Sequence, residues 1–282
     1  MKNLGYYNGE FDEIEKVKIP MSDRVCFFGD GVYDATYTKN YKIFALDEHV
    51  DRFFNSAKLL DINISISKEE LKLLLSNLVK KMDTDENFVY FQATRSTQSV
   101  REHVFSKEDR ANIWVNVYHK KIADLNKRVK LITLDDTRFL HCNIKTLNLI
   151  PSVMASKNAK DLGCDEAVFH RNGRVTECAH SNVHIIKDGI LKTAPTDNLI
   201  LPGIARAHII RACKTLKIPV IERPFSLEEL YFADEVIISS AGQLCLSASE
   251  IDKVKVGGRA QGIFKTLQDY LLNEFNEQTK KE

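Results

Sequence analysis

The sequence predicts an α+β protein of two domains. Two tight turns, Asn8-Gly9 and Asn172-Gly173, each lie between runs of apolar and β-forming residues, which is the pattern of a β-hairpin. Further strands and helices fall into two groups, separated by the polar and charged stretch 119–126. We therefore expect an N-terminal α+β domain over residues 1–118, a linker over 119–126 and a C-terminal domain over 127–282.

The N-terminal region contains several local signals. Gly29 and Gly31 predict a strained turn or a close approach of two backbones. They do not predict a phosphate loop, because no phosphate-loop pattern follows them. Asp47 is predicted to cap a helix with an apolar stripe, and Ser67-x-x-Glu70 is a capping box that opens a second helix. Strands are expected over 88–95 and 112–119, joined by a polar segment.

The C-terminal region alternates strands with helices. Three helices are expected in this region. The first covers about 152–162 and ends at Gly163, the second begins after Pro202-Gly203, and the third covers about 263–275. The capping box Ser226-x-x-Glu229 predicts a short helix before the strand "EVIISS".

Composition excludes several classes of function. Of the 282 residues, 44% are hydrophobic and 28% charged, as in a soluble globular protein. A formal net charge of +1 favours neither a nucleic-acid nor an anionic membrane partner. Neither a membrane-spanning run nor a secretory leader is found, so a cytoplasmic protein is expected.

Cysteine and histidine spacing predicts no metal site. The six cysteines form no C-x-x-C pair and are spread too widely for a disulfide framework, so most are expected to be small buried hydrophobes. His180 and His184 lie four residues apart but lack the glutamate of H-E-x-x-H.

Lys145 is the residue on which the chemical interpretation depends. It is one of 27 lysines (40 Lys+Arg less 13 Arg), but Ile144 and Leu147 surround it with apolar side chains. Desolvation favours the neutral, nucleophilic amine that forms a Schiff base. The alternative is a lysine whose head group reaches the surface, and the residues alone leave both interpretations open.

Three motifs indicate a family. The runs "GDGVYDATY" at 29–37, "IKTLNLI" at 144–150 and "VTECAHSNV" at 175–183 resemble those of fold-type IV pyridoxal-phosphate transaminases. The resemblance extends from Tyr6 to Leu272 and is strongest to the branch that acts on D-amino acids. It implies a small N-terminal α/β domain and a larger C-terminal mixed, β-barrel-like domain with helices.

The resemblance implies the cofactor pyridoxal 5′-phosphate and assigns its ligands. Lys145 matches the Schiff-base lysine, Glu177 the carboxylate at the pyridine nitrogen, and Arg52 the phosphate arginine. Without the family, an exposed strand glutamate and a surface helix arginine would be the ordinary interpretations. The remaining expected contacts are the apolar ring contact Leu201 and the phosphate-binding backbone and turn residues Ile204, Ala205, Ser240 and Ala241.

The resemblance also implies a substrate and a homodimer. Tyr33 and the R-x-H pair Arg101 and His103 match a trap for the substrate α-carboxylate, with the pair supplied by the neighbouring subunit. The expected reaction exchanges the amino group of D-alanine with 2-oxoglutarate, giving pyruvate and D-glutamate.

The sequence departs from the family pattern at several places. The segment between Arg95 and Arg101 is one residue longer than usual, and His180 replaces a small residue after Glu177. Ala205 and Ala241 stand where hydroxyl residues are common, which removes two side-chain hydrogen bonds to phosphate. No catalytic group is lost.

Three alternatives stay open at this point. A branched-chain L-amino-acid transaminase and an aminodeoxychorismate lyase use the same lysine and cofactor, and Arg101 and His103 argue against both. A non-catalytic binding domain would form no coloured complex with pyridoxal phosphate.

Overall fold

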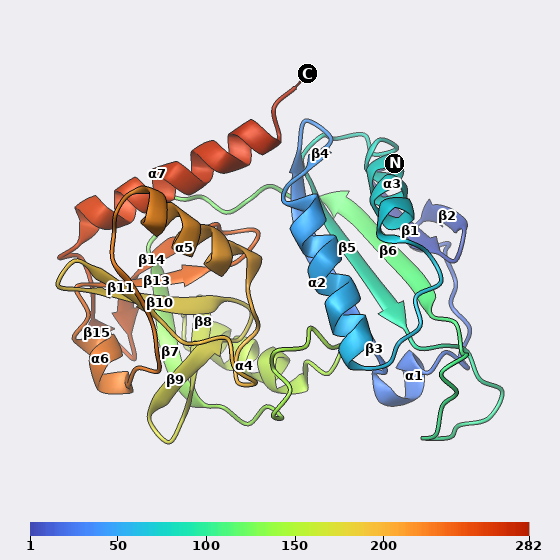
Figure 1. Cartoon of the computed structure of the whole chain (residues 1–282), viewed down its shortest axis with the longest axis horizontal. Coiled ribbons are helices and arrows are strands. Elements are labelled where there is room, and N and C mark those ends of the chain that lie inside the picture. Colours follow the sequence, from blue (N-terminus) through green and yellow to red (C-terminus); the bar gives the residue numbers. More distant parts are fainter. Residues whose placement is uncertain (282) are drawn as a thin grey trace. The chain divides into compact units, whose positions relative to one another are not determined.

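The computed structural model describes residues 1–281 and divides the chain into two compact units (Figure 1). The first contains Met1–Lys121, Ile144–Asn148 and the chain from Phe275 onward, and the second contains Ile122–Asn143 and Leu149–Glu274. The predicted α+β class is confirmed, since each unit combines a sheet with helices.

The stretch 144–148 lies in the first unit, whereas the sequence pattern predicted it in the C-terminal domain. Backbone pairing explains this placement. The Tyr33 N–H donates to the Lys145 carbonyl at 3.0 Å, the Leu147 N–H donates to the Gly31 carbonyl at 3.1 Å, and Val32 forms an isolated bridge with Thr146.

The first unit is built on a six-stranded antiparallel sheet with the order β2-β1-β6-β5-β3-β4. Figure 1 shows helix α2 running along this sheet. The strands are β1 (Asn3–Tyr7), β2 (Glu10–Glu13), β3 (Gly31–Lys39), β4 (Lys42–Ile43), β5 (Asn87–Thr94) and β6 (Asn112–His119). The helices are α1 (Val25–Phe28), α2 (Leu46–Leu59) and α3 (Lys68–Val79).

Several local predictions hold in this unit. The Asn8-Gly9 hairpin is confirmed, with both residues at positive φ (46° and 105°). The α3 capping box is confirmed by reciprocal hydrogen bonds between Ser67 and Glu70. The predicted close approach at Gly31 is confirmed, because a Cβ there would lie 2.6 Å from the Ala93 carbonyl oxygen.

The predicted cap of α2 is wrong. The helix begins at Leu46 after Ala45, whose φ is 50°, and Asp47 lies inside the first turn. Long-range contacts determine this start. The Ala45 N–H donates to Gln278 at 3.1 Å and the Phe44 ring packs on Phe275.

The core of the first unit lies between α2, α3 and the sheet. Apolar residues at helical spacing on both helices face the alternating inward residues of β5 and β6. Its fully buried members include Val50, Phe53, Leu71, Leu75, Val89, Phe91, Val115 and Val117.

The second unit contains a nine-stranded mixed sheet. Its order is β12-β11-β10-β13-β14-β7-β8-β9, with β15 paired to β14. The strands are β7 (Val129–Asp135), β8 (Glu166–Arg171), β9 (Arg174–Cys178), β10 (Asn182–Lys187), β11 (Ile190–Thr193), β12 (Val220–Glu222), β13 (Glu235–Ser239), β14 (Leu246–Ile251) and β15 (Val254–Lys255). The helices are α4 (Ile150–Asp161), α5 (Ile204–Thr215), α6 (Leu227–Tyr231) and α7 (Gln261–Gln278), the last turn of which belongs to the first unit.

Turn and cap chemistry also holds in the second unit. The Asn172-Gly173 hairpin, the start of α5 after Gly203 and the Ser226–Glu229 capping box are confirmed. Helix α4 begins two residues earlier than expected, with Pro151 in its first turn, where a missing N–H has no cost.

Among residues 1–281, no helix is both long and apolar enough to cross a membrane. The cytoplasmic location stays a prediction.

Leu75 tests the core of the first unit. Its side chain is 0% exposed in α3, whereas Leu73 in the same helix is 63% exposed. Leu75→Ala leaves a cavity and is expected to lower the free energy of unfolding by about 2–5 kcal/mol in urea titrations. Leu73→Ala is the matched control and should change it by less than about 0.5 kcal/mol. Equal effects of the two substitutions would contradict the described packing.

Candidate active site

Lys145 is positioned by backbone contacts to β3 and α2. Its N–H donates to the Ser56 hydroxyl at 3.2 Å, and its carbonyl accepts from the Tyr33 N–H at 3.0 Å. Ile144 beside it is buried in the core of the first unit. The half-buried Lys145 side chain places Nζ 4.2 Å from the centre of the Tyr33 ring. The structure therefore brings together two of the predicted site residues.

Arg52 is held by a buried carboxylate. Its Nε and Nη2 donate to the two oxygens of Asp34 at 2.8 and 2.7 Å, and Asp34 is fully buried on β3. Burial opposes ionisation of Asp34, but the Arg52 guanidinium and His49 outweigh it and hold the pKa of this carboxyl well below its usual range. Arg52 is thus a fixed, part-buried cation and not a mobile surface residue.

His49 completes this cluster. Its Nδ1 lies 2.7 Å from Asp34 Oδ1, and its side chain is buried on α2, one helical turn before Arg52. Neither Asp34 nor His49 was predicted from the sequence. A signal existed for each: Asp34 occupies an inward position of a strand, and His49 precedes Arg52 at the i, i+3 spacing of one helix face.

Arg101 and His103 lie on an anchored but exposed segment. The buried Arg24 guanidinium donates to the Glu102 carbonyl at 2.6 Å and to the His103 carbonyl at 3.2 Å, which fixes the backbone. The Arg101 and His103 side chains are exposed, and both lie within about 5 Å of the Phe28 ring.

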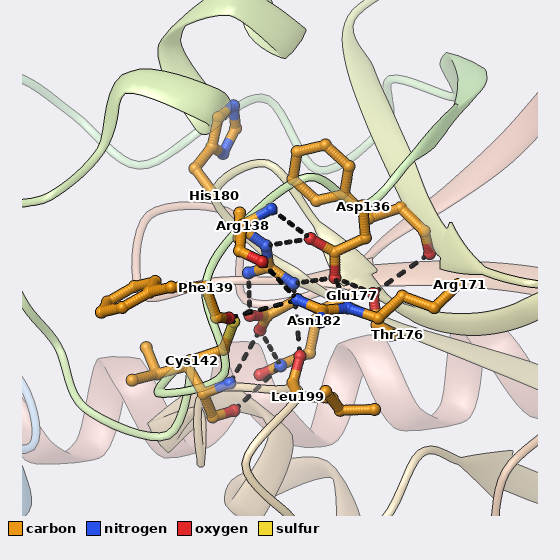
Figure 2. Close-up of polar contacts among 12 residues, drawn as sticks. Asp136, Arg138, Phe139, Cys142, Arg171, Thr176, Glu177, His180, Asn182 and Leu199 are labelled. Atoms are coloured by element: carbon orange, nitrogen blue, oxygen red, sulfur yellow. Dashed lines mark hydrogen bonds and ion pairs between the residues drawn. The ribbon is translucent and has the colours of Figure 1, made fainter.

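Glu177 is a buried residue at the end of β9, not an exposed strand glutamate. Figure 2 shows the Arg138 guanidinium between two carboxylates, Asp136 and Glu177. Arg171 and Thr176 donate to Asp136 from the other side, at 3.1 and 3.0 Å. Burial opposes the charge of Arg138, but its two acidic partners outweigh this and raise the pKa of its guanidinium above the usual value.

The second oxygen of Glu177 is also occupied. It accepts from the Asn182 side chain and from the Leu201 N–H, both at 3.0 Å. Asn182 donates in addition to the Leu201 carbonyl at 3.0 Å, so Leu201 is tied to the same group through both its backbone atoms. Neither Arg138 nor Asn182 was singled out from the sequence, because nothing local to either residue reveals its partner.

The N-terminus of α5 is open for an anion. Gly203 is its N-cap and supplies no side-chain cap, and the first turn holds no acidic residue. The N–H groups at this end, including those of Ile204 and Ala205, have no partner within the helix and carry the positive end of the helix dipole. Close packing requires the glycine, because a Cβ at Gly203 would lie 1.9 Å from Asn182 Oδ1.

Ser240 and Ala241 form a turn directly after β13. Ser240 donates to Gln243 at 3.2 Å and its carbonyl accepts from the Gln243 N–H, which closes the turn. The preceding residue, Ser239, lies 2.8 Å from Nε2 of the buried His184. Burial and the charge of Arg206 lower the pKa of His184 to about 3, so this histidine is a neutral hydrogen-bonding group.

His180 lies outside this cluster. Its exposed ring has Nδ1 3.3 Å from the buried Glu166, whose other oxygen accepts from Ser181 at 2.7 Å. In Figure 2 the ring is directed away from the Arg138–Glu177 pair.

Comparison with known proteins identifies the family. Residues 31–251 match the model of the amino-transferase class IV family. The chain belongs to this family. Its curated relatives include D-alanine aminotransferases from Listeria monocytogenes serotype 4b (strain F2365), at 39% identity over 95% of this chain and 94% of the relative, and from Staphylococcus haemolyticus, at 35% identity over 94% and 95%.

Solved class IV structures share its fold. A branched-chain amino acid aminotransferase from T.th., with pyridoxamine 5′-phosphate, superposes with a TM-score of 0.88 at 25% identity, covering 98% of this chain and 95% of that chain. The Escherichia coli branched-chain enzyme gives a TM-score of 0.89 at 22% identity, covering 100% and 97%. The predicted fold-type IV architecture is therefore confirmed.

The cofactor of this class IV aminotransferase is pyridoxal 5′-phosphate, and the residues present fit it. The second unit offers a buried carboxylate whose position is fixed by three donors, and a helix N-terminus whose glycine leaves no room for a side chain. The first unit offers a half-buried lysine and a fixed arginine. An electron-sink cofactor with a phosphate needs each of these groups.

Gly203 tests this fit. Gly203→Ala would force Asn182 away from Glu177 and Leu201, and it is expected to weaken pyridoxal-phosphate binding about tenfold, because a hydrogen bond to a charged group contributes about 1.5–3 kcal/mol. Cofactor titration of the full-length protein measures this. Gly262→Ala in α7 is the control, since a Cβ there meets nothing within 4 Å. Unchanged affinity in Gly203→Ala would contradict the described packing.

Proposed function

We propose that this class IV aminotransferase is a D-amino-acid transaminase that exchanges the amino group of D-alanine with 2-oxoglutarate, giving pyruvate and D-glutamate. The observation that carries the proposal is the similarity to curated D-alanine aminotransferases, at 35–39% identity over about 95% of the chain.

The proposed cofactor ligands are those expected from the sequence. Lys145 holds the cofactor covalently, Glu177 contacts the pyridine nitrogen, and Arg52 binds the phosphate. Leu201 packs on the ring, and the turns at Ile204–Ala205 and Ser240–Ala241 complete the phosphate contacts. The open N-terminus of α5 and the fixed Asp34–Arg52 pair support these roles.

Proton transfer is assigned to Lys145. Bound pyridoxal phosphate supplies an electron sink for the electron pair left on the substrate Cα when its proton is removed. When it is not bonded to the cofactor, Lys145 Nζ would take this proton and later give it up again, so that one amine would act first as base and then as acid. The half-buried position of the amine, with Nζ 4.2 Å from the centre of the Tyr33 ring, supports this role.

Substrate selection is assigned to Tyr33, Arg101 and His103. Tyr33 lies beside Lys145, and an arginine is suited to bind the α-carboxylate through two parallel hydrogen bonds. Arg24 fixes the backbone at Glu102 and His103, and the Arg101 and His103 side chains are exposed beside the Phe28 ring. This arrangement supports delivery of the pair to the neighbouring subunit.

A homodimer is part of the proposal. The segments 20–28 and 96–104 are joined by backbone hydrogen bonds and together expose a group of large apolar side chains. Val104 is 78% exposed and Met21 is 88% exposed, and Phe27 and Val100 belong to the same two segments. Exposed apolar patches of this kind typically mark protein interfaces.

The half-reaction with single amino acids tests the function. Without a 2-oxo acid, D-alanine is expected to remove the visible absorbance of the yellow holoenzyme, whereas L-leucine should leave it unchanged. Lys145→Ala should show no turnover, and Arg101→Met should raise KM for D-alanine, because the carboxylate loses a charged partner.

Other outcomes have defined meanings. Loss of absorbance with L-leucine alone would replace the proposal by branched-chain transamination, the activity named for the similar solved structures. No response to either amino acid would favour the lyase. A protein that pyridoxal phosphate cannot colour would contradict the enzyme assignment.

A further inference from the structure

His49 has a buried nitrogen that the proposed function does not use. Its side chain is 1% exposed, and Nε2 is buried without a hydrogen-bond partner in the described chain. Buried polar atoms are almost always paired, so an unpaired one calls for an explanation. The explanation depends on which of the two ring nitrogens carries the hydrogen.

Asp34 fixes the tautomer of His49. The Asp34 carboxylate is ionised and can only accept, so His49 Nδ1, at 2.7 Å, donates to it. Burial, with the charges of Arg52 and Lys145, lowers the pKa of His49 although Asp34 opposes this. The ring is therefore neutral, and Nε2 presents a lone pair, which is a hydrogen-bond acceptor.

The face of α2 that carries His49 also holds the Lys145 segment. His49, Arg52 and Ser56 follow one another at the i, i+3, i+7 spacing of a single helix face. Ser56 accepts from the Lys145 N–H at 3.2 Å, and the Lys145 charge acts on His49. Lys145 is thus a donor-bearing side chain with a flexible stem, held by its backbone at this face of the helix.

Two elements of the first unit approach Lys145. Tyr33 lies against its Nζ from β3, and α2 contributes Ser56, which accepts from the Lys145 N–H, and His49, which lies within the influence of the Lys145 charge. Asp34 is already occupied by Arg52 and His49, so its charge reaches the lysine only through them.

We propose that Lys145 Nζ, which lies against the Tyr33 ring in the described conformation, turns to donate a hydrogen bond to His49 Nε2 when the amine is free, and that this contact positions it for proton transfer. The proposal rests on the proposed role of Lys145. It makes His49 a positioning residue whose own orientation is determined by Asp34. A neutral acceptor suits this task, because a carboxylate at the same place would hold the lysine as a permanent ammonium.

A matched pair of substitutions separates this role from a purely structural one. In His49→Asn the amide nitrogen can replace Nδ1 and donate to Asp34, but nothing replaces Nε2. In His49→Gln the longer side chain places an amide oxygen near the Nε2 position. His49→Asn therefore retains only the contact with Asp34, and His49→Gln retains only the acceptor for Lys145, so the two roles can be compared.

The first readout is the titration of Lys145 in the full-length chain without cofactor. Lysines are acetylated briefly with limiting acetic anhydride at a series of pH values, and the extent at Lys145 is measured by peptide mass spectrometry against the exposed Lys58. In His49→Asn the midpoint is expected to fall by about one pH unit, because the ammonium loses its acceptor, whereas His49→Gln should stay near the wild type.

The second readout is steady-state kinetics of the holoenzyme. His49→Asn is expected to lower kcat about tenfold with little change in KM, because the proton carrier is misplaced but the substrate contacts remain. His49→Gln should retain most of kcat. Cofactor affinity should be similar in both, since Arg52 still pairs with Asp34.

Two results would overturn the proposal. Equal Lys145 midpoints in all three proteins would show that His49 does not bind the lysine. A wild-type Lys145 midpoint and kcat in His49→Asn, together with a lowered midpoint and kcat in His49→Gln, would show that His49 serves only to hold Asp34. A failed D-alanine half-reaction in the wild type would reject the proposed function, but the Lys145 titration would still decide the role of His49.

Nuclear magnetic resonance provides a test that does not depend on whether the His49 variants fold, because His49 itself is left unchanged. With ¹⁵N-labelled histidine, the Nε2 signal of His49 is expected to shift when Lys145→Met removes the donor. An unchanged signal would contradict the proposal.

Discussion

The contacts of the buried Asp34 carboxylate with Arg52 and His49 determine how these polar side chains are arranged in the first unit. A fully buried charge is stable only when opposite charges and donors surround it, and Arg52 and His49 provide them. The same contacts fix the guanidinium in a defined direction and select one tautomer of the imidazole. One carboxylate on β3 therefore determines how two residues of α2 are oriented, and the same helix contacts the Lys145 backbone through Ser56.

The second unit uses the same principle with the signs reversed. There the buried cation Arg138 holds the carboxylates of Asp136 and Glu177, and Asn182 and Leu201 occupy the remaining oxygen of Glu177. A carboxylate restrained in this way can meet a ring nitrogen without reorganising, which is the usual basis of electrostatic preorganisation.

Local chemistry explains which parts of the fold could be predicted. The Asn-Gly hairpins and both capping boxes depend on residues a few positions apart, and all of them are confirmed. The predicted start of α2 was wrong because contacts with Phe275 and Gln278, more than 200 residues away, determine it. Asp34, His49, Arg138 and Asn182 were missed for the same reason, since each acquires its role from a partner that only the folded chain brings near. The roles of Lys145 and Glu177 stay predictions from the family motifs, whereas their burial and their partners could be described only from the structure.

We propose that Lys145, held between β3 and α2, carries the cofactor. Borohydride reduction of the yellow holoenzyme followed by proteolysis and peptide mass spectrometry tests it most directly. We expect a pyridoxyl group on the peptide that contains Lys145 and on no other lysine. A pyridoxyl group on a different lysine, or its absence from every peptide of a coloured preparation, would contradict it.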